Sequence, residues 1–136
     1  MKLLTFCAIP MLFLIACSKN NNDDPSNTIS GRYAGTFKRY NTSIDKTARV
    51  SIDFNKEYWS GSSELATYPA LNTGTFSLAN NNETISFKNK AGWTADFDWT
   101  FILDGNFILH KNNDSLVFTK SYGNGAVDVY KLAKEK

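Results

Sequence analysis

The sequence predicts an all-β domain, an antiparallel up-and-down meander of eight to nine short strands. Aromatic residues make up 14% of the 136-residue chain, and apolar and polar residues alternate in several short runs. Asparagine, serine and glycine interrupt these runs at short intervals, which is typical of tight turns. Such a meander closes into a barrel or folds onto itself as a sandwich. We favour the barrel, because closure removes the exposed strand edges.

Alternating segments in the first part of the domain predict strands at residues 31–37, 48–54, 73–79 and 84–88. In the second segment, Val50, Ile52 and Phe54 share the inward face. Gly35 lies between two aromatic residues of the first segment, Tyr33 and Phe37, which predicts a close backbone approach or a bend.

The connections between these segments differ in length. A two-residue turn at residues 55–56 sets Ile52 opposite Trp59. Residues 61–72 show no alternation and contain a proline. We therefore expect the longest loop of the domain there, and a candidate lid.

The most aromatic stretch, residues 93–118, organises the second part of the domain. Phe97, Trp99 and Phe101 alternate with polar residues and predict a strand. A three-residue turn that ends at a left-handed Gly105 places apolar residues opposite apolar residues, whereas a two-residue turn does not. The pairs that it predicts are Trp99 with Leu109 and Phe101 with Phe107.

Further turns extend this aromatic interior in both directions. A turn at residues 90–92 predicts the pairs Phe87 with Ala95 and Ile85 with Phe97. A turn at residues 112–113 and a loop over residues 122–126 predict the pairs Leu109 with Leu116, Phe107 with Phe118, Phe118 with Tyr130, and Leu116 with Leu132.

The same register places Asp98 opposite His110 on the outer face, next to Ser115. An Asp-His-Ser line suits nucleophilic catalysis, but the neighbouring sequence supplies no oxyanion donors. We interpret these residues as a solvent-exposed polar face and predict no catalytic residue. His110 is the only histidine and cannot make a zinc site alone, so neither a metal nor a cofactor is expected.

The interior of an eight-stranded barrel is just wide enough to be filled by side chains or to hold one small ligand. The many inward aromatic residues favour a mostly filled barrel. We expect any cavity at the mouth, near residues 61–72. The candidate ligand-binding residues are Trp59, Tyr68, Trp93 and Trp99.

The N-terminus predicts export and anchoring. Lys2 precedes an uncharged apolar run at residues 3–16, which is shorter than the roughly 20 residues of a spanning helix and typical of a secretory signal. The residues Leu14, Ile15, Ala16 and Cys17 resemble the lipobox of bacterial lipoproteins.

This resemblance implies a signal peptide at residues 1–16 and lipid on Cys17, which anchors the protein to a membrane. Two or more fatty acyl chains anchor a protein stably to a membrane, whereas one chain does not. The polar residues 17–29 then form a flexible tether, and residues 30–136 form one domain. Asp23 and Asp24 resemble the export signal of surface lipoproteins in the Bacteroidota, although a solvated linker explains them equally well. We expect the protein to lie in the cell envelope, anchored to the outer membrane on its periplasmic face or at the cell surface.

Charge argues against one class of partner. Only Lys2 of the 15 basic residues precedes Cys17, so the mature chain carries 14 Lys and Arg against 13 Asp and Glu. These charges are interspersed, which leaves no basic stripe for nucleic acid.

The opening segment at residues 31–37, the meander and the closing segment at residues 128–132 look like the lipocalin-like lipoproteins of the Bacteroidota. This resemblance implies a small barrel that binds a small apolar or amphipathic ligand or an envelope protein. The alternative is a non-catalytic structural, interaction or inhibitor protein with a filled barrel. An apolar cavity of at least ~300 Å³ inside the barrel would favour the ligand-binding function. A solid interior would favour the structural, interaction or inhibitor protein.

Overall fold

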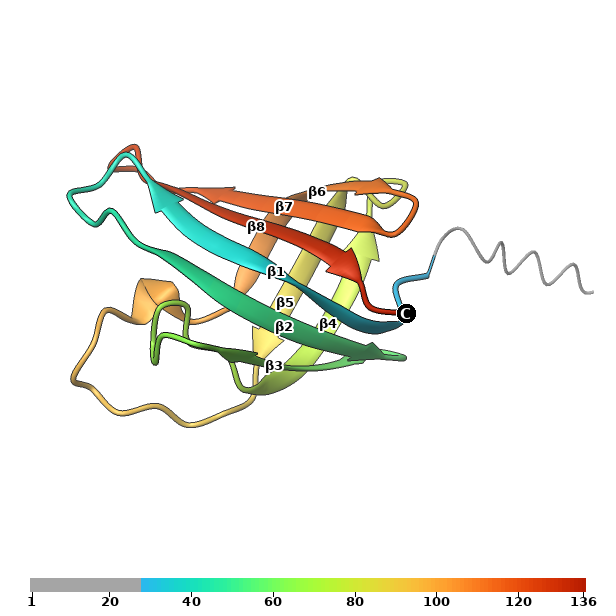
Figure 1. The fold of residues 1–136 in the computed structure, drawn as a ribbon, viewed down its shortest axis with the longest axis horizontal. Helices are drawn as coiled ribbons and strands as arrows, with labels where there is room; N and C mark the ends of the chain where they lie inside the picture. The colour runs from blue at the N-terminus through green and yellow to red at the C-terminus, as the bar shows by residue number, and fades with distance from the viewer. Residues whose placement is uncertain (1–27) are drawn as a thin grey trace, which may run out of the picture.

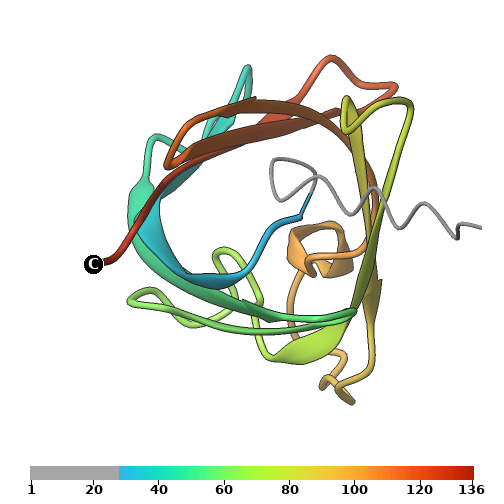
Figure 2. The ribbon, with the colours of Figure 1, turned by 90° about the vertical axis from the view of Figure 1, so that its right-hand side faces the viewer.

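The computed structural model describes residues 28–136, which form a closed barrel (Figures 1 and 2). Each strand pairs antiparallel with the next, and β8 pairs with β1. The strands are β1 (Gly31–Tyr40), β2 (Thr47–Asn55), β3 (Tyr58–Ser63), β4 (Thr73–Ala79), β5 (Thr84–Asn89), β6 (Gly105–Asn112), β7 (Ser115–Ser121) and β8 (Val127–Lys134). The predicted all-β meander and its closure into a barrel are confirmed, and the sandwich is not formed.

The alternating pattern locates the strands of the first part well. All four predicted segments fall within β1, β2, β4 and β5, and Val50, Ile52 and Phe54 are buried. The close approach at Gly35 is also confirmed. A Cβ atom there would lie 1.9 Å from the backbone oxygen of Lys131 on β8, so only glycine lets the two strands meet at this point.

Two hairpin turns lie one residue later than predicted. The β2–β3 turn uses Lys56, with a φ of 56°, and it sets Phe54 opposite Trp59. The β6–β7 turn follows Asn112, and it sets Leu109 opposite Phe118. The predicted partners in both hairpins are therefore wrong by two positions. The inward faces are still correct, because side chains on a strand alternate with a period of two.

The last hairpin has the predicted register. Phe118 pairs with Tyr130 and Leu116 with Leu132 across β7 and β8. All four side chains are buried in the barrel.

The strand predicted around Trp99 does not exist. Residues 90–104 leave the sheet, and within them Trp99–Phe101 form the short 3₁₀-helix η2. β5 pairs directly with β6, which sets Ile85 opposite Phe107. The pairs predicted for this segment, such as Trp99 with Leu109, are therefore wrong. Gly105 does have a positive φ, of 92°, but it begins β6 opposite Phe87.

Residues 90–104 leave the wall because they close one end of the barrel. Phe101 and Leu103 are buried there, whereas Trp99 is 57% exposed. Ala70 forms a bridge with Ile102, so the loop before β4 packs against this segment. We call residues 64–72 and 90–104 together the mouth plug. Figure 2 shows η2 inside the outline of the barrel.

The other end of the barrel is covered by the chain before β1. Ile29 is only 3% exposed and belongs to the hydrophobic core, although the sequence placed it at the end of the tether. Figure 1 shows this N-terminal end and η2 at opposite ends of the barrel. Cys17, the predicted signal peptide and residues 17–27 of the predicted tether lie outside the described residues.

Aromatic rings fill the space between the two ends. Phe87 lies 6.3 Å from Phe54, 5.3 Å from Phe118 and 5.6 Å from Phe107, measured between ring centroids. These rings come from β2, β5, β6 and β7, so their contacts cross the lumen. The observed packing is that of a filled barrel.

Candidate functional site

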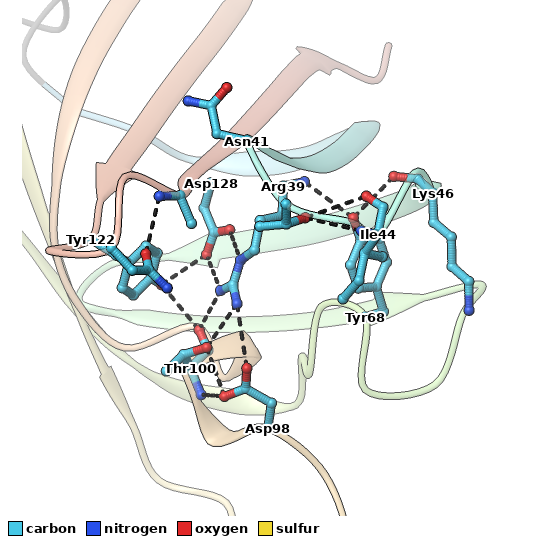
Figure 3. A network of polar contacts seen from close by, with 12 residues as sticks. Arg39, Asn41, Ile44, Lys46, Tyr68, Asp98, Thr100, Tyr122 and Asp128 are labelled. Carbon is cyan, nitrogen blue, oxygen red and sulfur yellow. Dashed lines mark hydrogen bonds and ion pairs between the residues drawn. The ribbon is translucent and has the colours of Figure 1, made fainter.

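A buried ion pair lies where the barrel wall meets the mouth plug. Arg39 on β1 and Asp128 on β8 are both almost fully buried, and they are direct partners in the strand register. The guanidinium donates from Nε to Asp128 Oδ1 at 2.6 Å and from Nη2 to Oδ2 at 2.8 Å (Figure 3). Two parallel charge-assisted bonds of this kind hold both side chains in one orientation.

The strand pattern explains why these charges face inward. Arg39 follows Tyr33 and Phe37 at even spacing along β1, and Asp128 precedes Tyr130 by two residues on β8. Both therefore point to the inside of the barrel. A sequence signal existed: two opposite charges lie at inward positions of neighbouring terminal strands. Neither residue is among the candidate site residues predicted from the sequence.

Arg39 also holds the mouth plug. Its Nη1 donates to Thr100 Oγ1 at 2.8 Å, and its Nη2 donates to the backbone oxygen of Thr100 at 3.0 Å. The guanidinium carbon lies 3.8 Å from the ring centroid of Phe101, a cation–π contact. One arginine thus fixes the position of η2 relative to β1 and β8.

Two further side chains complete this network. Asp98 caps η2 by accepting from the backbone nitrogen and the hydroxyl of Thr100, and its Oδ2 lies 3.6 Å from Arg39 Nη1. The Tyr122 hydroxyl shares its single proton between two acceptors, Asp128 Oδ2 at 2.8 Å and the backbone oxygen of Thr100 at 3.0 Å. The network ties three separate segments of the chain together.

The protonation states of Asp98 and Tyr122 keep the network intact at neutral pH. Hydrogen bonds from Thr100 lower the pKa of Asp98, so this carboxylate stays ionised. Burial and the hydrogen bond to Asp128 raise the pKa of Tyr122 well above its ordinary value, so its hydroxyl keeps its proton.

Two of the four predicted ligand-binding residues belong to the core. Trp59 is 1% exposed and packs edge-to-face on Phe87, with ring centroids 5.8 Å apart. Its Nε1 finds no hydrogen-bond partner within residues 28–136. Tyr68 packs on Phe37 and Phe101, and its hydroxyl accepts from the backbone nitrogen of Arg39. Tyr68 supports the mouth from inside, whereas Trp59 belongs to the core beneath β3.

The other two predicted residues, Trp93 and Trp99, lie together at the surface of the mouth plug. They line a pocket of about 500 Å³. Its remaining lining residues are Asn89, Ala91, Gly92, Ile102 and Asp104. Trp93 and Trp99 thus lie at the mouth, where the sequence predicts any cavity, although Trp99 reaches it from η2 and not from the predicted strand.

The polar residues once aligned by the predicted register are not assembled. Asp98 caps η2 and approaches Arg39, whereas His110 pairs with Val117 on the barrel wall. Over the described range, no three His, Cys, Asp or Glu side chains are grouped to hold a metal ion. No helix in residues 28–136 has the length and apolar character needed to cross a membrane.

The fold and its mouth define a class of structure, an antiparallel eight-stranded meander barrel with a filled interior and one plugged end. Comparison of the chain with known families, curated proteins and solved structures finds no match to a family model, to a curated protein or to a solved structure.

Proposed function

We propose that this chain is a lipid-anchored protein of the bacterial cell envelope that has no catalytic activity. It binds its ligand or partner with the outer surface of its barrel mouth, not with the barrel interior. Of the two functions that a lipocalin-like barrel implies, this is the interaction protein with a filled barrel.

The packing of the lumen carries this proposal. A ligand inside the barrel would have to displace Phe87, whose ring contacts Phe54 on one side and Phe118 on the other. Protein interiors packed in this way have few voids larger than a water molecule. A pocket of about 500 Å³ lies instead at the surface, beside Trp93 and Trp99.

The arrangement of the two barrel ends fits an anchor at Cys17. The described chain before β1 lies at the end of the barrel opposite η2 (Figure 1), and Ile29 in this segment is buried. Lipid on Cys17 would hold the N-terminal end near a bilayer and leave the mouth plug facing away from it. A polar tether between Cys17 and residue 28 gives the barrel room to meet a partner.

The polar side chains near the mouth have structural contacts that fit a non-catalytic role. The buried pair of Arg39 and Asp128 holds η2, and Asp98 caps it, whereas His110 lies opposite Val117 on the wall.

Membrane fractionation and mass spectrometry test the anchor. We expect the full-length chain, expressed in a bacterium that processes lipoproteins, to sediment with membranes and to carry a diacylglyceryl group on Cys17. The Cys17→Ala variant should be recovered unanchored. If this variant stays in the membrane like the parent, the lipid anchor is wrong.

Native mass spectrometry of the full chain, released from detergent, tests the filled interior. We expect the mass of the lipidated protein alone, and no stoichiometric binding of added palmitate or N-phenylnaphthylamine. An apolar ligand that copurifies and that is lost when Phe87 is enlarged to tryptophan would overturn the filled-barrel proposal.

A further inference from the structure

The pocket beside Trp93 and Trp99 has the features of a ligand site. Its volume of about 500 Å³ falls within the roughly 300–1,000 Å³ of small-molecule pockets. Two of the three tryptophans of the chain line it, together with Asn89 and Asp104 as polar groups. A largely apolar lining with a few polar groups is the usual composition of such sites.

Both indoles are held in fixed orientations by their ring nitrogens. Trp93 Nε1 donates to Asn89 Oδ1 at 3.1 Å, and Trp99 Nε1 donates to the backbone oxygen of Thr94 at 2.8 Å. The polar edge of each ring is thus occupied within the protein. What remains for a ligand is the ring face, which carries the negative end of the aromatic quadrupole.

Trp99 is exposed because the Arg39 network holds η2 in place. The helix points Phe101 into the barrel and leaves Trp99 57% exposed at its start. Trp99 lines the pocket together with Trp93, so its exposure belongs to a shared aromatic surface and is not that of a single scattered side chain.

The charges around the pocket select the sign of the ligand. Between Ala91 and Asp104 the chain has three aspartates and no lysine or arginine, although Lys90 precedes the segment. Asp104 itself lines the pocket, and its Oδ1 accepts from the backbone nitrogen of Asn89. The ammonium of Lys120 donates to the backbone oxygen of Asp104, not to its carboxylate.

The two other aspartates of this segment, Asp96 and Asp98, lie outside the pocket lining. Hydrogen bonds from Thr94 and Thr100 lower the pKa of Asp96 and Asp98 respectively, so both carboxylates are ionised at neutral pH. Buried Arg39 pairs with Asp128 and also approaches Asp98 Oδ2 at 3.6 Å. Of the three aspartates, Asp104 therefore supplies the negative charge that lines the pocket.

We propose that the pocket formed by Trp93, Trp99 and Asp104 binds a small organic cation of the ammonium class. The cationic head lies against the indole faces and is balanced by the Asp104 carboxylate. Tryptophan is the best aromatic partner for such cations, and quaternary ammonium groups are a known use of aromatic sites. This inference deepens the proposed function, on which it rests, by naming the ligand class of the barrel mouth.

Isothermal titration calorimetry on the full-length chain in detergent micelles tests the charge requirement. The two probes are choline and 3,3-dimethylbutan-1-ol, which has the same shape without the charge. We expect choline to bind and to change the tryptophan fluorescence, and the neutral alcohol to bind about tenfold more weakly. Equal affinities would mean that the pocket is merely apolar and would overturn the proposal.

Substitutions locate the bound cation. Trp99→Ala should weaken choline binding about tenfold, and Asp104→Asn should weaken it and reduce its dependence on salt. Tyr58→Ala is the matched control, because Tyr58 is also 57% exposed but lies on the barrel wall away from the pocket. Trp99→Ala with unchanged choline affinity would overturn the site.

Failure of this inference can be told apart from failure of the proposed function. If choline, tetramethylammonium and spermidine all fail to bind at about 10 mM, which would saturate a millimolar site, the cation site is wrong. The two parts of the proposed function, the lipid anchor on Cys17 and the filled barrel interior, would be unaffected by this result. Loss of membrane attachment with choline binding retained would count against the anchor alone.

Discussion

The wall and the mouth plug of this barrel are stabilised in different ways. The wall is a continuous ladder in which every strand pairs with two neighbours. The mouth plug has an isolated bridge between Ala70 and Ile102 and a few backbone hydrogen bonds to β2, β3 and β4 at its margins. Side chains with Arg39 at their centre attach η2 to β1 and β8. A continuous ladder of backbone bonds thus stabilises the wall, whereas a small number of separate contacts, many of them from side chains, position the mouth.

This difference bears on function. The wall surrounds a packed aromatic core and is the part of the molecule whose changes should cost most stability. The mouth plug carries the exposed Trp99 and the pocket, so its outer residues should tolerate substitution while changing binding. Comparison of matched residues in the two regions tests whether this division holds.

The largest expected difference in stability between the two regions comes from substitution of one tryptophan in each. We expect Trp59→Ala, in the core under the wall, to reduce the free energy of unfolding by about 3–5 kcal/mol, because it leaves a large cavity. Trp99→Ala, at the surface of the plug, should change it by no more than about 0.5 kcal/mol. Urea unfolding followed by circular dichroism measures both. Similar losses in the two variants would show that the plug surface is as integral to the fold as the core.

Arg39 tests the junction between the two regions. Arg39→Met should cost about 3–5 kcal/mol of unfolding free energy, because Asp128 then keeps a buried charge without its partner. The exposed pair of Arg49 and Glu64 is the control, and Arg49→Met should cost no more than about 1 kcal/mol.

A double variant separates charge from packing at this junction. Arg39→Met combined with Asp128→Leu should recover most of the stability, since no unpaired charge remains. It should still loosen η2, which loses its bonds from Arg39 to Thr100. Hydrogen exchange at residues 98–102 would detect this. Full protection of η2 in the double variant would contradict the role that we assign to Arg39.

The wall could be predicted from the sequence because its pattern is local. Alternation of Val50, Ile52 and Phe54 reports directly which side chains face inward, and this parity survives a turn placed one residue early. Cross-strand partners are less certain, because they depend on where each turn begins. That is why Phe118 and Tyr130 were paired correctly while Leu109 and Leu116 were not.

The mouth could not be predicted because its pattern has a different cause. Phe97, Trp99 and Phe101 alternate as in a strand, yet only Phe101 of the three is buried, through a 3₁₀ turn that enters the barrel end. The open end of a barrel offers apolar contacts that exist only after the wall has closed. Short-range periodicity carries no information about such a surface.

Substitution of one glycine in each region compares how tightly the backbone is packed in the wall and in the plug. Gly35→Ala on the wall should cost about 1–3 kcal/mol, because the new Cβ would lie 1.9 Å from a backbone oxygen of β8. Gly92→Ala in the plug should stay within about 0.5 kcal/mol, since no heavy atom lies within 4 Å of its added Cβ. Thermal unfolding measures both variants. A Gly92→Ala loss as large as that of Gly35→Ala would show the plug to be packed like the wall.

The smallest expected effect is a dependence of stability on alkaline pH. Burial raises the pKa of Tyr122 above its ordinary value of 10.0, so the folded protein holds this proton more tightly than the unfolded chain. The resulting stabilisation is fully present below pH 10 and is lost as the pH rises toward the folded pKa. Tyr122→Phe, measured by urea unfolding between neutral and strongly alkaline pH, should show a shallower decline than the parent. Tyr58→Phe, exposed on the wall, should decline like the parent. An unchanged decline in Tyr122→Phe would mean that this hydroxyl does not couple the plug to the ion pair.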